Sequence, residues 1–342
     1  MLNRRTIYSG LGRLHRALEM HEWDGAKFVI LLDENTFQHC FPLLIQRVKR
    51  LRQAEFIEVP AGEEAKSIEV AAQVWQTLIE GGADRSTVIV NLGGGCICDL
   101  GGFVASGYMR GIRHINIPTT LLAMVDAAIG GKTAINMSGV KNCIGYFHSP
   151  VLTCIDTTFL ETLPEAELLN GKLEMVKTAA VSNQELYNNI LTAKTSFRFD
   201  HSMLIKTIAR IKVHVVKADP LDQGIRHILN FGHTFGHAIE MYSNLPHGVS
   251  VGIGMRVAMY LSVHKLGMPQ EVLDEYSEWL RGQVTVPRYT LSDIEAMLAL
   301  MHRDKKNADG NLLCVLLNKP GEAVIDVAVS DNEVRDAMLK LK

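Results

Sequence analysis

The first 120 residues alternate short β-branched, apolar runs with amphipathic segments. The apolar runs end in turn-forming residues: KFVILLDEN (27–35), EFIEVPAG (55–62), STVIVNLGGG (86–95) and HINIPTT (114–120). Between them lie segments with apolar residues three and four apart, such as SIEVAAQVWQTLIEGG (67–82). Strands that alternate with helices form a mostly parallel sheet covered on both faces. This half therefore predicts an α/β, Rossmann-like domain.

From about residue 158 the pattern changes to one helix-like segment after another. These segments cover residues 159–181, 202–219, 226–248, 249–267 and 291–305. Only LLCVLLN (312–318) and AVIDVAV (323–329) have the pattern of short strands. We therefore expect an α/β domain over residues 1–157 and a mainly α-helical domain over residues 158–342.

Composition excludes several classes of protein. A chain of 342 residues is long for a single core, which agrees with two domains. A net charge of −2 argues against a general nucleic-acid binder, and no apolar run fits a signal peptide or a membrane span. Six scattered cysteines show neither metal-ribbon nor redox spacing, so a reducing cytoplasm is the simplest compartment. They are Cys40, Cys96, Cys98, Cys143, Cys154 and Cys314.

Polar residues follow the expected strand ends, where ligands bind in parallel sheets. They are Asp33, Glu63, Asp99 and Thr119. Asp33 could hold a ribose hydroxyl of a cofactor, but on its own it is better explained as the cap of the next helix.

GGGCICDLGGF (93–103) follows a strand and begins a helix. Glycines there let the backbone approach a phosphate, and the first turn of a helix offers free N–H groups to an anion. The dinucleotide fingerprint fails because Cys98 replaces its last glycine. On these residues alone, a cofactor loop and a tight structural turn remain equally open.

GGKT (130–133) resembles the end of a P-loop, but Asp126 stands where the first glycine of that motif belongs. An ATP-binding loop of the Walker type is therefore excluded. Lys132 lies close to Asp126 within an otherwise apolar stretch. A solvated turn is the alternative, and the apolar neighbours argue against it.

RHILNFGHTFGHAIEMYSNLPHG (226–248) places His233 and His237 four residues apart, on one face of a helix. The spacing alone is weak evidence because the chain has 13 histidines. Thr234 replaces the glutamate that a zinc protease needs, so that class is excluded.

The neighbours of these histidines strengthen the signal. Arg226 and Asn230 are expected on adjoining turns, and His247 follows a short break. Burying so many polar groups without partners would cost several kcal/mol, so a metal ion or an anionic ligand is expected among them. Glu174 and Lys177 are three residues apart on another helix, where a surface ion pair is the alternative. A carboxylate with two imidazoles is a common ligand set for catalytic zinc.

Taken together and in order, these segments resemble the 3-dehydroquinate synthase family of sugar-phosphate cyclases. The matching segments are AGEEAKS, GGGCICDLGGFVASGYMRG, IPTTLLAMVDAAIGGKTAIN, KNCIGYF, LEMVK, LNFGHTFGHAIE, PHG and DKK. The resemblance covers most of the chain, and the ordered succession is specific although no single segment is.

The resemblance implies an NAD-binding N-terminal domain, a helical metal-binding domain and an active site in the cleft between them. The implied ligands of a zinc or cobalt ion are Glu174, His233 and His247. The implied phosphate-binding residues are Asn142, Lys177, Asn230 and His237, and those for the substrate carboxylate are Lys212, Arg226 and Lys305. Asp126 and Lys132 are further implied catalytic residues, and Arg110 resembles an arginine that family members lend across a homodimer interface. The implied cofactor positions are Glu63, Lys66, Gly95, Asp99, Thr119, Thr120, Lys132, Lys141 and Thr162, and Asp33 stays a cofactor candidate because of its place at a strand end.

The implied reaction belongs to the shikimate pathway and starts from 3-deoxy-D-arabino-heptulosonate 7-phosphate. NAD oxidises a hydroxyl, phosphate leaves, the ketone is reduced again and the ring closes by an aldol step, which gives 3-dehydroquinate. The chain departs from the family at Ala127, Ala128, Val249 and Leu173. None of these is a charged contact, so we expect altered packing or rate and not lost chemistry.

Three other functions remain open. A sister cyclase acting on another sugar phosphate would not need Lys212, Arg226 and Lys305 for a carboxylate. A metal-dependent polyol dehydrogenase would accumulate reduced NAD and would not need the cations around a phosphate. A non-catalytic NAD-binding relative would have lost a metal ligand or a phosphate-binding lysine, and the sequence retains them.

Overall fold

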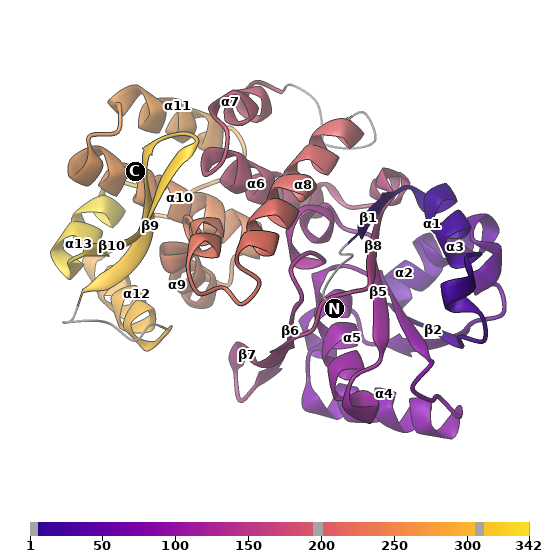
Figure 1. Ribbon diagram of the computed structural model, residues 1–342. Coiled ribbons are helices and arrows are strands. Elements are labelled where there is room, and N and C mark those ends of the chain that lie inside the picture. The colour runs from indigo at the N-terminus through magenta and orange to yellow at the C-terminus, as the bar shows by residue number, and fades with distance from the viewer. Residues whose placement is uncertain (1–5, 194–200, 305–310, 342) are drawn as a thin grey trace. The chain divides into compact units, whose positions relative to one another are not determined.

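The computed structural model describes residues 6–193, 201–304 and 311–341. The chain divides into two compact units, one of residues 1–168 and 197–213 and the other of residues 169–196 and 214–342. The first is an α/β unit with a parallel sheet and the second is mainly helical, which confirms the predicted fold class (Figure 1). The domain boundary expected after residue 157 stays a prediction. No helix in the described ranges is long and apolar enough to cross a membrane.

The sheet of the first unit has six parallel strands in the order β1-β8-β5-β4-β2-β3. Their bounds are β1 Thr6–Ser9, β2 Phe28–Asp33, β3 Glu55–Val59, β4 Val88–Gly93, β5 Arg113–Pro118 and β8 Leu152–Ile155. Every residue of β2 and β4 is buried, as expected for central strands covered on both faces. The chain runs from β2 to the edge strand β3 and returns to β4 on the other side of β2. The carboxyl ends of β2 and β4 therefore flank a topological switch point, where such sheets bind ligands.

Helices and short helical turns connect these strands. They are α1 Leu11–Leu18, η1 His21–Trp23, α2 Glu34–His39, α3 Phe41–Arg47, η2 Lys49–Leu51, η3 Gly62–Ala65, α4 Ile68–Glu80, α5 Gly95–Gly107, η4 Tyr108–Arg110, the π-helical turn η5 Ala123–Ala127 and η6 Thr157–Glu161. Strand residues such as Val29 and Ile89 join Val74 of α4 and Phe103 of α5 in one apolar cluster. This packing fixes where α5 begins, directly after β4.

A hairpin follows η5 and consists of β6 Lys132–Met137 and β7 Val140–Phe147. Its two-residue turn has Ser138 at φ 50° and Gly139 at φ 78°. Positive φ at both central residues is the geometry of the tight turns that suit the right-handed twist of a hairpin.

The second unit consists of helices and one further hairpin. Its elements are the greater part of α6 Glu165–Ala180, α7 Gln184–Thr192, the end of α8 Ser202–Ala218, η8 Ile225–Asn230, α9 His233–Ser243, α10 His247–Leu266, α11 Gln270–Arg281, α12 Leu291–Asp304, β9 Leu312–Lys319, β10 Glu322–Val329 and α13 Asp331–Leu339. Helix α10 packs closely on α9 because of glycine, since a Cβ at Gly236 would lie only 2.9 Å from Cα of Val251. The antiparallel pair β9–β10 confirms the two short strands expected near the end of the sequence.

The helix-like stretch 226–248 is not one continuous helix. Residues 225–230 form the 3-10 turn η8, α9 begins at His233, and α10 begins at His247. The interruption lies at Gly232, whose φ of 78° is left-handed and whose missing Cβ would lie 2.6 Å from Cγ of Met255. The expectation that Arg226 and Asn230 continue the turns of the histidine helix is therefore wrong.

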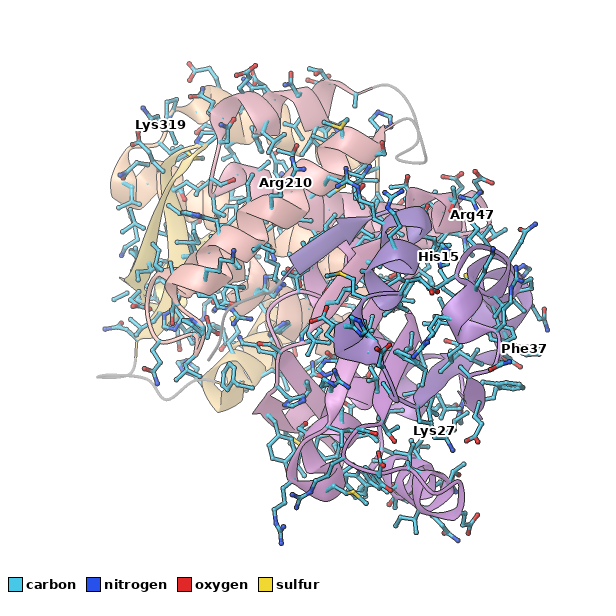
Figure 2. All side chains as sticks on the ribbon, turned by 45° about the vertical axis from the view of Figure 1, so that its right-hand side comes forward. His15, Lys27, Phe37, Arg47, Arg210 and Lys319 are labelled. Carbon is cyan, nitrogen blue, oxygen red and sulfur yellow. The ribbon has the colours of Figure 1, made fainter. Side chains whose placement is uncertain are left out.

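The surface of the first unit carries an aromatic group beside the edge strand. The rings of Phe37 and Phe41 stack with centroids 5.5 Å apart, and Phe56 of β3 packs on both. Lys27 bonds to Glu55 of the same strand at 2.8 Å. Phe37 points outward in Figure 2.

Candidate functional site

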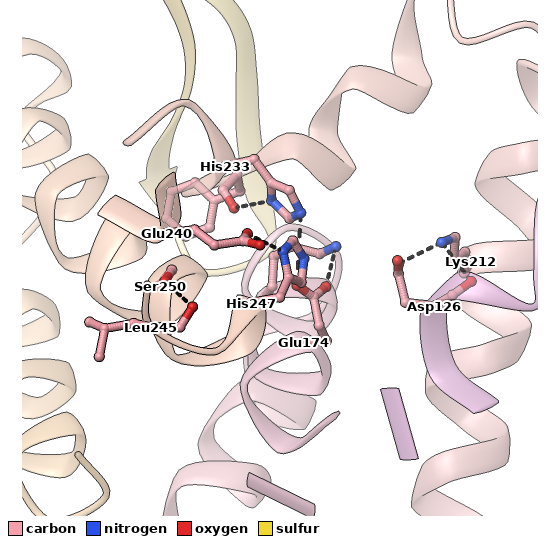
Figure 3. A network of polar contacts seen from close by, with 10 residues as sticks. Asp126, Glu174, Lys212, His233, Glu240, Leu245, His247 and Ser250 are labelled. Carbon is pink, nitrogen blue, oxygen red and sulfur yellow. Dashed lines mark hydrogen bonds and ion pairs between the residues drawn. The ribbon is translucent and has the colours of Figure 1, made fainter. Parts of the chain in front are cut away.

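A fully buried carboxylate and two imidazoles meet in the second unit. Glu174 lies on α6, and His233 and His247 are the first residues of α9 and α10. Oε1 of Glu174 lies 3.8 Å from Nε2 of His233 and 3.5 Å from Nε2 of His247. One ligand atom from each residue lies within 4.8 Å of the other two, and in the described part of the chain these three form a group that could hold a metal ion. The expected ligands are therefore brought together (Figure 3).

The other ring nitrogen of each histidine is already bonded. Nδ1 of His247 lies 2.9 Å from Oε2 of Glu240, and Nδ1 of His233 lies 3.3 Å from the carbonyl oxygen of Phe231. Both acceptors require a proton on Nδ1, so Nε2 is the nitrogen that faces Glu174 and could bind a cation. Metal-binding histidines in proteins are usually held in this way. The arrangement fits a divalent cation.

Lys177 shares the buried position of Glu174. Its Nζ lies 2.5 Å from Oε2 of Glu174, and both side chains are 1% exposed. The pair is therefore not the surface ion pair that the sequence left open. Burial raises the pKa of Glu174, but Lys177 and the two histidines outweigh it and hold that pKa well below its usual range. The carboxylate is ionised, as a metal ligand must be.

The two histidines differ in charge environment. Burial and the nearby Lys177 lower the pKa of His233 well below its usual value. Burial also lowers the pKa of His247, but hydrogen bonds with Glu174 and Glu240 outweigh it and raise that pKa to about 10. A cation bound at this position would have to displace the proton of His247.

Three further predicted residues lie in the same unit. The ring of His237 is 5.2 Å from that of His233 and 5.9 Å from that of His247, measured between centroids. Arg226 is 4% exposed and donates from its Nη1 to the carbonyl oxygen of Pro220 at 3.1 Å. Asn230 ends η8 and is half-buried. Lys305 lies outside the described residues.

The predicted cofactor turn in the first unit has the expected local structure. β4 ends at Gly93, and α5 begins at Gly95 with Gly94 as an N-cap that makes no side-chain hydrogen bond. A Cβ at Gly94 would lie 3.0 Å from Cγ2 of Thr120, and one at Gly95 would lie 3.2 Å from Cβ of Ala127. The glycines therefore allow close packing here, and the first N–H groups of α5 are not bonded by a capping side chain.

Charged residues surround this turn. Lys66 is 3% exposed, and its Nζ donates to Oδ2 of Asp99 at 2.7 Å and also to Oδ1 of Asn142. Burial lowers the pKa of Lys66, but Asp99 and Glu63 outweigh it and raise that pKa, so the ammonium stays charged. Burial raises the pKa of Asp99 in spite of Lys66.

The remaining predicted residues of the first unit lie in several places. Asp33 caps α2 by accepting from the backbone N–H of Thr36 at 2.8 Å, which is the structural role that the sequence favoured. Thr119 is buried directly after β5, whereas Arg110, Lys132, Lys141 and Thr162 are exposed. Asp126 pairs with Lys212, whose Nζ lies 2.5 Å from Oδ1 of Asp126 (Figure 3).

Two residues that bond to the predicted site residues were not themselves predicted from the sequence. Glu240 lies seven positions after His233, so the i, i+4, i+7 spacing of His233, His237 and Glu240 on α9 was a usable signal. Asn136 of β6 bonds to Glu63 and to Asn142, and no pattern in the sequence marks it.

The departures from the family pattern are accommodated by packing. Leu173 is fully buried and lies against Gly252. A Cβ added at Gly252 would lie 2.7 Å from Cδ2 of Leu173. Ala128 is 1% exposed, and Ala127 lies against Gly95. Val249 is half-buried in the first turn of α10. None of the four side chains carries a group that could bond to a ligand.

Comparison with known proteins identifies the family of this chain. Residues 56–170 match the family model for the N-terminal part of 3-dehydroquinate synthase, and residues 171–307 match the model for its C-terminal part. The chain is 38% identical over 321 residues to 3-dehydroquinate synthase of Parabacteroides distasonis, which covers 91% of this chain and 90% of the relative.

Solved structures of related cyclases have the same fold. A 2-deoxy-scyllo-inosose synthase complexed with carbaglucose-6-phosphate, NAD+ and Co2+ superposes with a TM-score of 0.87 at 22% identity, over 98% of this chain and 96% of that one. The 2-epi-5-epi-valiolone synthase of Streptomyces hygroscopicus, with NAD+ and Zn2+ bound, gives a TM-score of 0.83 at 26% identity, over 100% and 97%. The likeness at 22% identity shows the fold alone, whereas the two family models and the relative at 38% identity show the family. This chain belongs to the 3-dehydroquinate synthase family.

Proposed function

We propose that this protein is a cytoplasmic 3-dehydroquinate synthase. It converts 3-deoxy-D-arabino-heptulosonate 7-phosphate into 3-dehydroquinate and phosphate, a carbon–oxygen lyase step of the shikimate pathway. The observation that carries the proposal is the buried Glu174 facing Nε2 of His233 and His247 in a chain that belongs to this family. Small dianionic substrates and a divalent cation suit such a set of residues.

The enzyme uses NAD and a divalent cation, Zn2+ or Co2+. Glu174, His233 and His247 hold the cation, and the turn at Gly93–Gly95 with Lys66, Asp99 and Thr119 receives the cofactor. When bound, NAD accepts and returns a hydride, and the cation polarises the oxygen of the hydroxyl that is transiently oxidised. The N–H groups at the start of α5 suit a pyrophosphate because the helix dipole favours negative charge there.

The side chains around these sites compensate the charges of the substrate. Lys177, Asn142, Asn230 and His237 hold its phosphate, and Lys212, Arg226 and Lys305 hold its carboxylate. Lys177, Lys212 and Arg226 are all less than 9% exposed, and solvent screens buried charges only weakly. A substrate with two anionic groups therefore binds where the chain has already placed the opposite charge.

The chain's groups act mainly by orientation. Fixed cations hold one reactive conformer of the substrate, which lowers the entropic part of the barrier. The substrate phosphate itself takes the proton of the carbon next to the transient ketone, so no separate carboxylate base is needed. Arg110 contributes to the neighbouring subunit's site in a homodimer.

The experiment is to incubate the protein with the heptulosonate phosphate, NAD and Zn2+ and to identify 3-dehydroquinate by chromatography and mass. Lys177→Met should remove most of the activity, because it removes the ammonium that pairs with Glu174 and the donor that holds the substrate phosphate. Lys172→Met is the matched control on the same helix, since Lys172 contacts Trp279 of α11 and Gln283 in the turn after it. If the protein cyclises a sugar phosphate without a carboxylate but does not convert the heptulosonate phosphate, it is a sugar-phosphate cyclase of another substrate class.

A further inference from the structure

The β6–β7 hairpin contains a bulge at the residues assigned to the cofactor and the substrate. Ile135 pairs with Ile144 and Met137 pairs with Val140, and the register shifts between these pairs. A single residue of β6, Asn136, therefore lies opposite residues 141–143 of β7. Asn142 in the middle of this bulge has φ 55°, the left-handed conformation that asparagine tolerates better than most residues. Bulges often re-aim side chains next to active sites.

Three polar groups of Asn136 connect its own strand β6 to residues 63–66 and to strand β7. Its backbone N–H donates to the carbonyl oxygen of Lys66 at 2.7 Å. Its Nδ2 donates to Oε2 of Glu63 at 2.8 Å, and its Oδ1 accepts from the backbone N–H of Asn142 at 2.8 Å. The orientation of the amide is unambiguous, because a carboxylate can only accept here and a backbone N–H can only donate.

The contacts of Glu63 and Lys66 continue the connection. Burial raises the pKa of Glu63, but Lys66, the amide of Asn136 and Lys141 outweigh it and lower that pKa below its usual value. Glu63 is therefore a charged acceptor for Asn136. Lys66 bonds at the same time to Asp99 and to the side chain of Asn142. Asn142 is thus held twice, by its backbone through Asn136 and by its side chain through Lys66.

We propose that Asn136 is a positioning residue that locks the β7 bulge and couples the cofactor residue Glu63 to the phosphate residue Asn142. The roles of Glu63 and Asn142 rest on the proposed function. Asn136 itself touches neither ligand. It keeps the left-handed backbone of Asn142 in place so that the side chain reaches the substrate phosphate, and it keeps Glu63 at the cofactor.

Three variants test the connection. Asn136→Ala removes both side-chain bonds. Asn136→Asp keeps an acceptor for the Asn142 N–H but places a second carboxylate against Glu63. Adding Glu63→Gln to Asn136→Asp restores the bond with donor and acceptor exchanged. Asn188→Asp, an exposed substitution on α7, is the control.

Two kinds of measurement test the hydrogen bonds of Asn136 separately from the proposed function. Hydrogen exchange of the Asn142 amide in the ligand-free protein reports only the hydrogen bond between that amide and the side chain of Asn136. In Asn136→Ala we expect this amide to exchange about tenfold faster or more, and the Michaelis constant for the heptulosonate phosphate to rise about tenfold while kcat changes much less. In Asn136→Asp the Asn142 amide should also exchange faster, and the Kd for NAD should rise by a similar factor. The double variant should restore slow exchange of the Asn142 amide.

Unchanged exchange at Asn142 in Asn136→Ala would overturn the proposal. So would a double variant whose Asn142 amide exchanges as fast as in Asn136→Asp, and this pair decides the matter if Asn136→Ala does not fold. A wild-type protein that makes no 3-dehydroquinate would refute the proposed function instead, and the exchange measurement would still decide whether Asn136 holds the bulge.

Discussion

Glu240 orients His247, and its removal should weaken the binding of a divalent cation. Oε2 of Glu240 accepts from Nδ1 of His247 at 2.9 Å, and the exposed fractions of the two side chains are 11% and 34%. In Glu240→Ala the imidazole loses the partner that fixes both its tautomer and its ring orientation. The folded structure should persist because Glu240 lies near the end of α9 and alanine favours helix.

The size of the effect follows from this hydrogen bond. A bond to a charged group contributes about 1.5–3 kcal/mol, and each 1.4 kcal/mol is a factor of about ten. The partial exposure of His247 places the loss in the lower half of this range. We therefore expect the Kd for Zn2+ to rise by roughly 10- to 40-fold, within the range of other partners of metal-binding histidines.

The assay is competition for Zn2+ against a chromophoric chelator at fixed pH. Glu240→Gln retains an acceptor without the charge and should fall between the wild type and Glu240→Ala. Glu271→Gln, an exposed carboxylate on α11, is the matched control. A Kd for Zn2+ in Glu240→Ala equal to that of the control would show that Glu240 does not orient a metal ligand.

Four further predictions concern the rest of the site and the stability of the fold. His247→Ala should lose nearly all bound metal after dialysis, and full metal content by elemental analysis would refute its assignment. Arg226→Ala should raise the Michaelis constant for the acid substrate at least about tenfold, because a charged hydrogen bond is lost; an unchanged constant would move the carboxylate site. Mixing Arg110→Ala with Lys177→Met subunits should recover activity above either parent if Arg110 acts across a dimer, and no recovery would favour a self-contained site. Burial and the neighbouring His148 lower the pKa of His114 to about 3, so the unfolded state alone binds that proton between about pH 6.5 and 3. Wild-type stability should therefore decrease with acidification by up to about 1.4 kcal/mol per pH unit more than that of His114→Leu, as measured by urea unfolding, and equal slopes would refute this.

The sequence predicts those elements whose residues are uniformly buried or strongly periodic. β2 and β4 were expected because a buried parallel strand is apolar throughout. β1 and β8 have four residues each, too few to separate a strand from a loop by periodicity. All but one residue of β7 are exposed, so no hydrophobic pattern indicates it.

The residues of the candidate site also divide into those that the sequence indicates and those that depend on contacts distant in sequence. Glu174, His233 and His247 were expected from residue type and family resemblance, and the structure brings them together. The break at Gly232 depends on contact with Met255, which is distant in sequence and leaves no local pattern. Asn136 escapes prediction for a related reason, since its role depends on a bulge in the facing strand.

The proposed function requires a closed redox cycle, in which NAD is reduced and then oxidised again in each turnover. The measurement that tests it most directly is the ratio of phosphate released to reduced NAD accumulated, followed together in the Zn2+-loaded protein with the heptulosonate phosphate. We predict many equivalents of phosphate per subunit with no net rise in absorbance of reduced NAD. A stoichiometric rise in reduced NAD, or no phosphate release from protein that binds both NAD and Zn2+, would contradict the account.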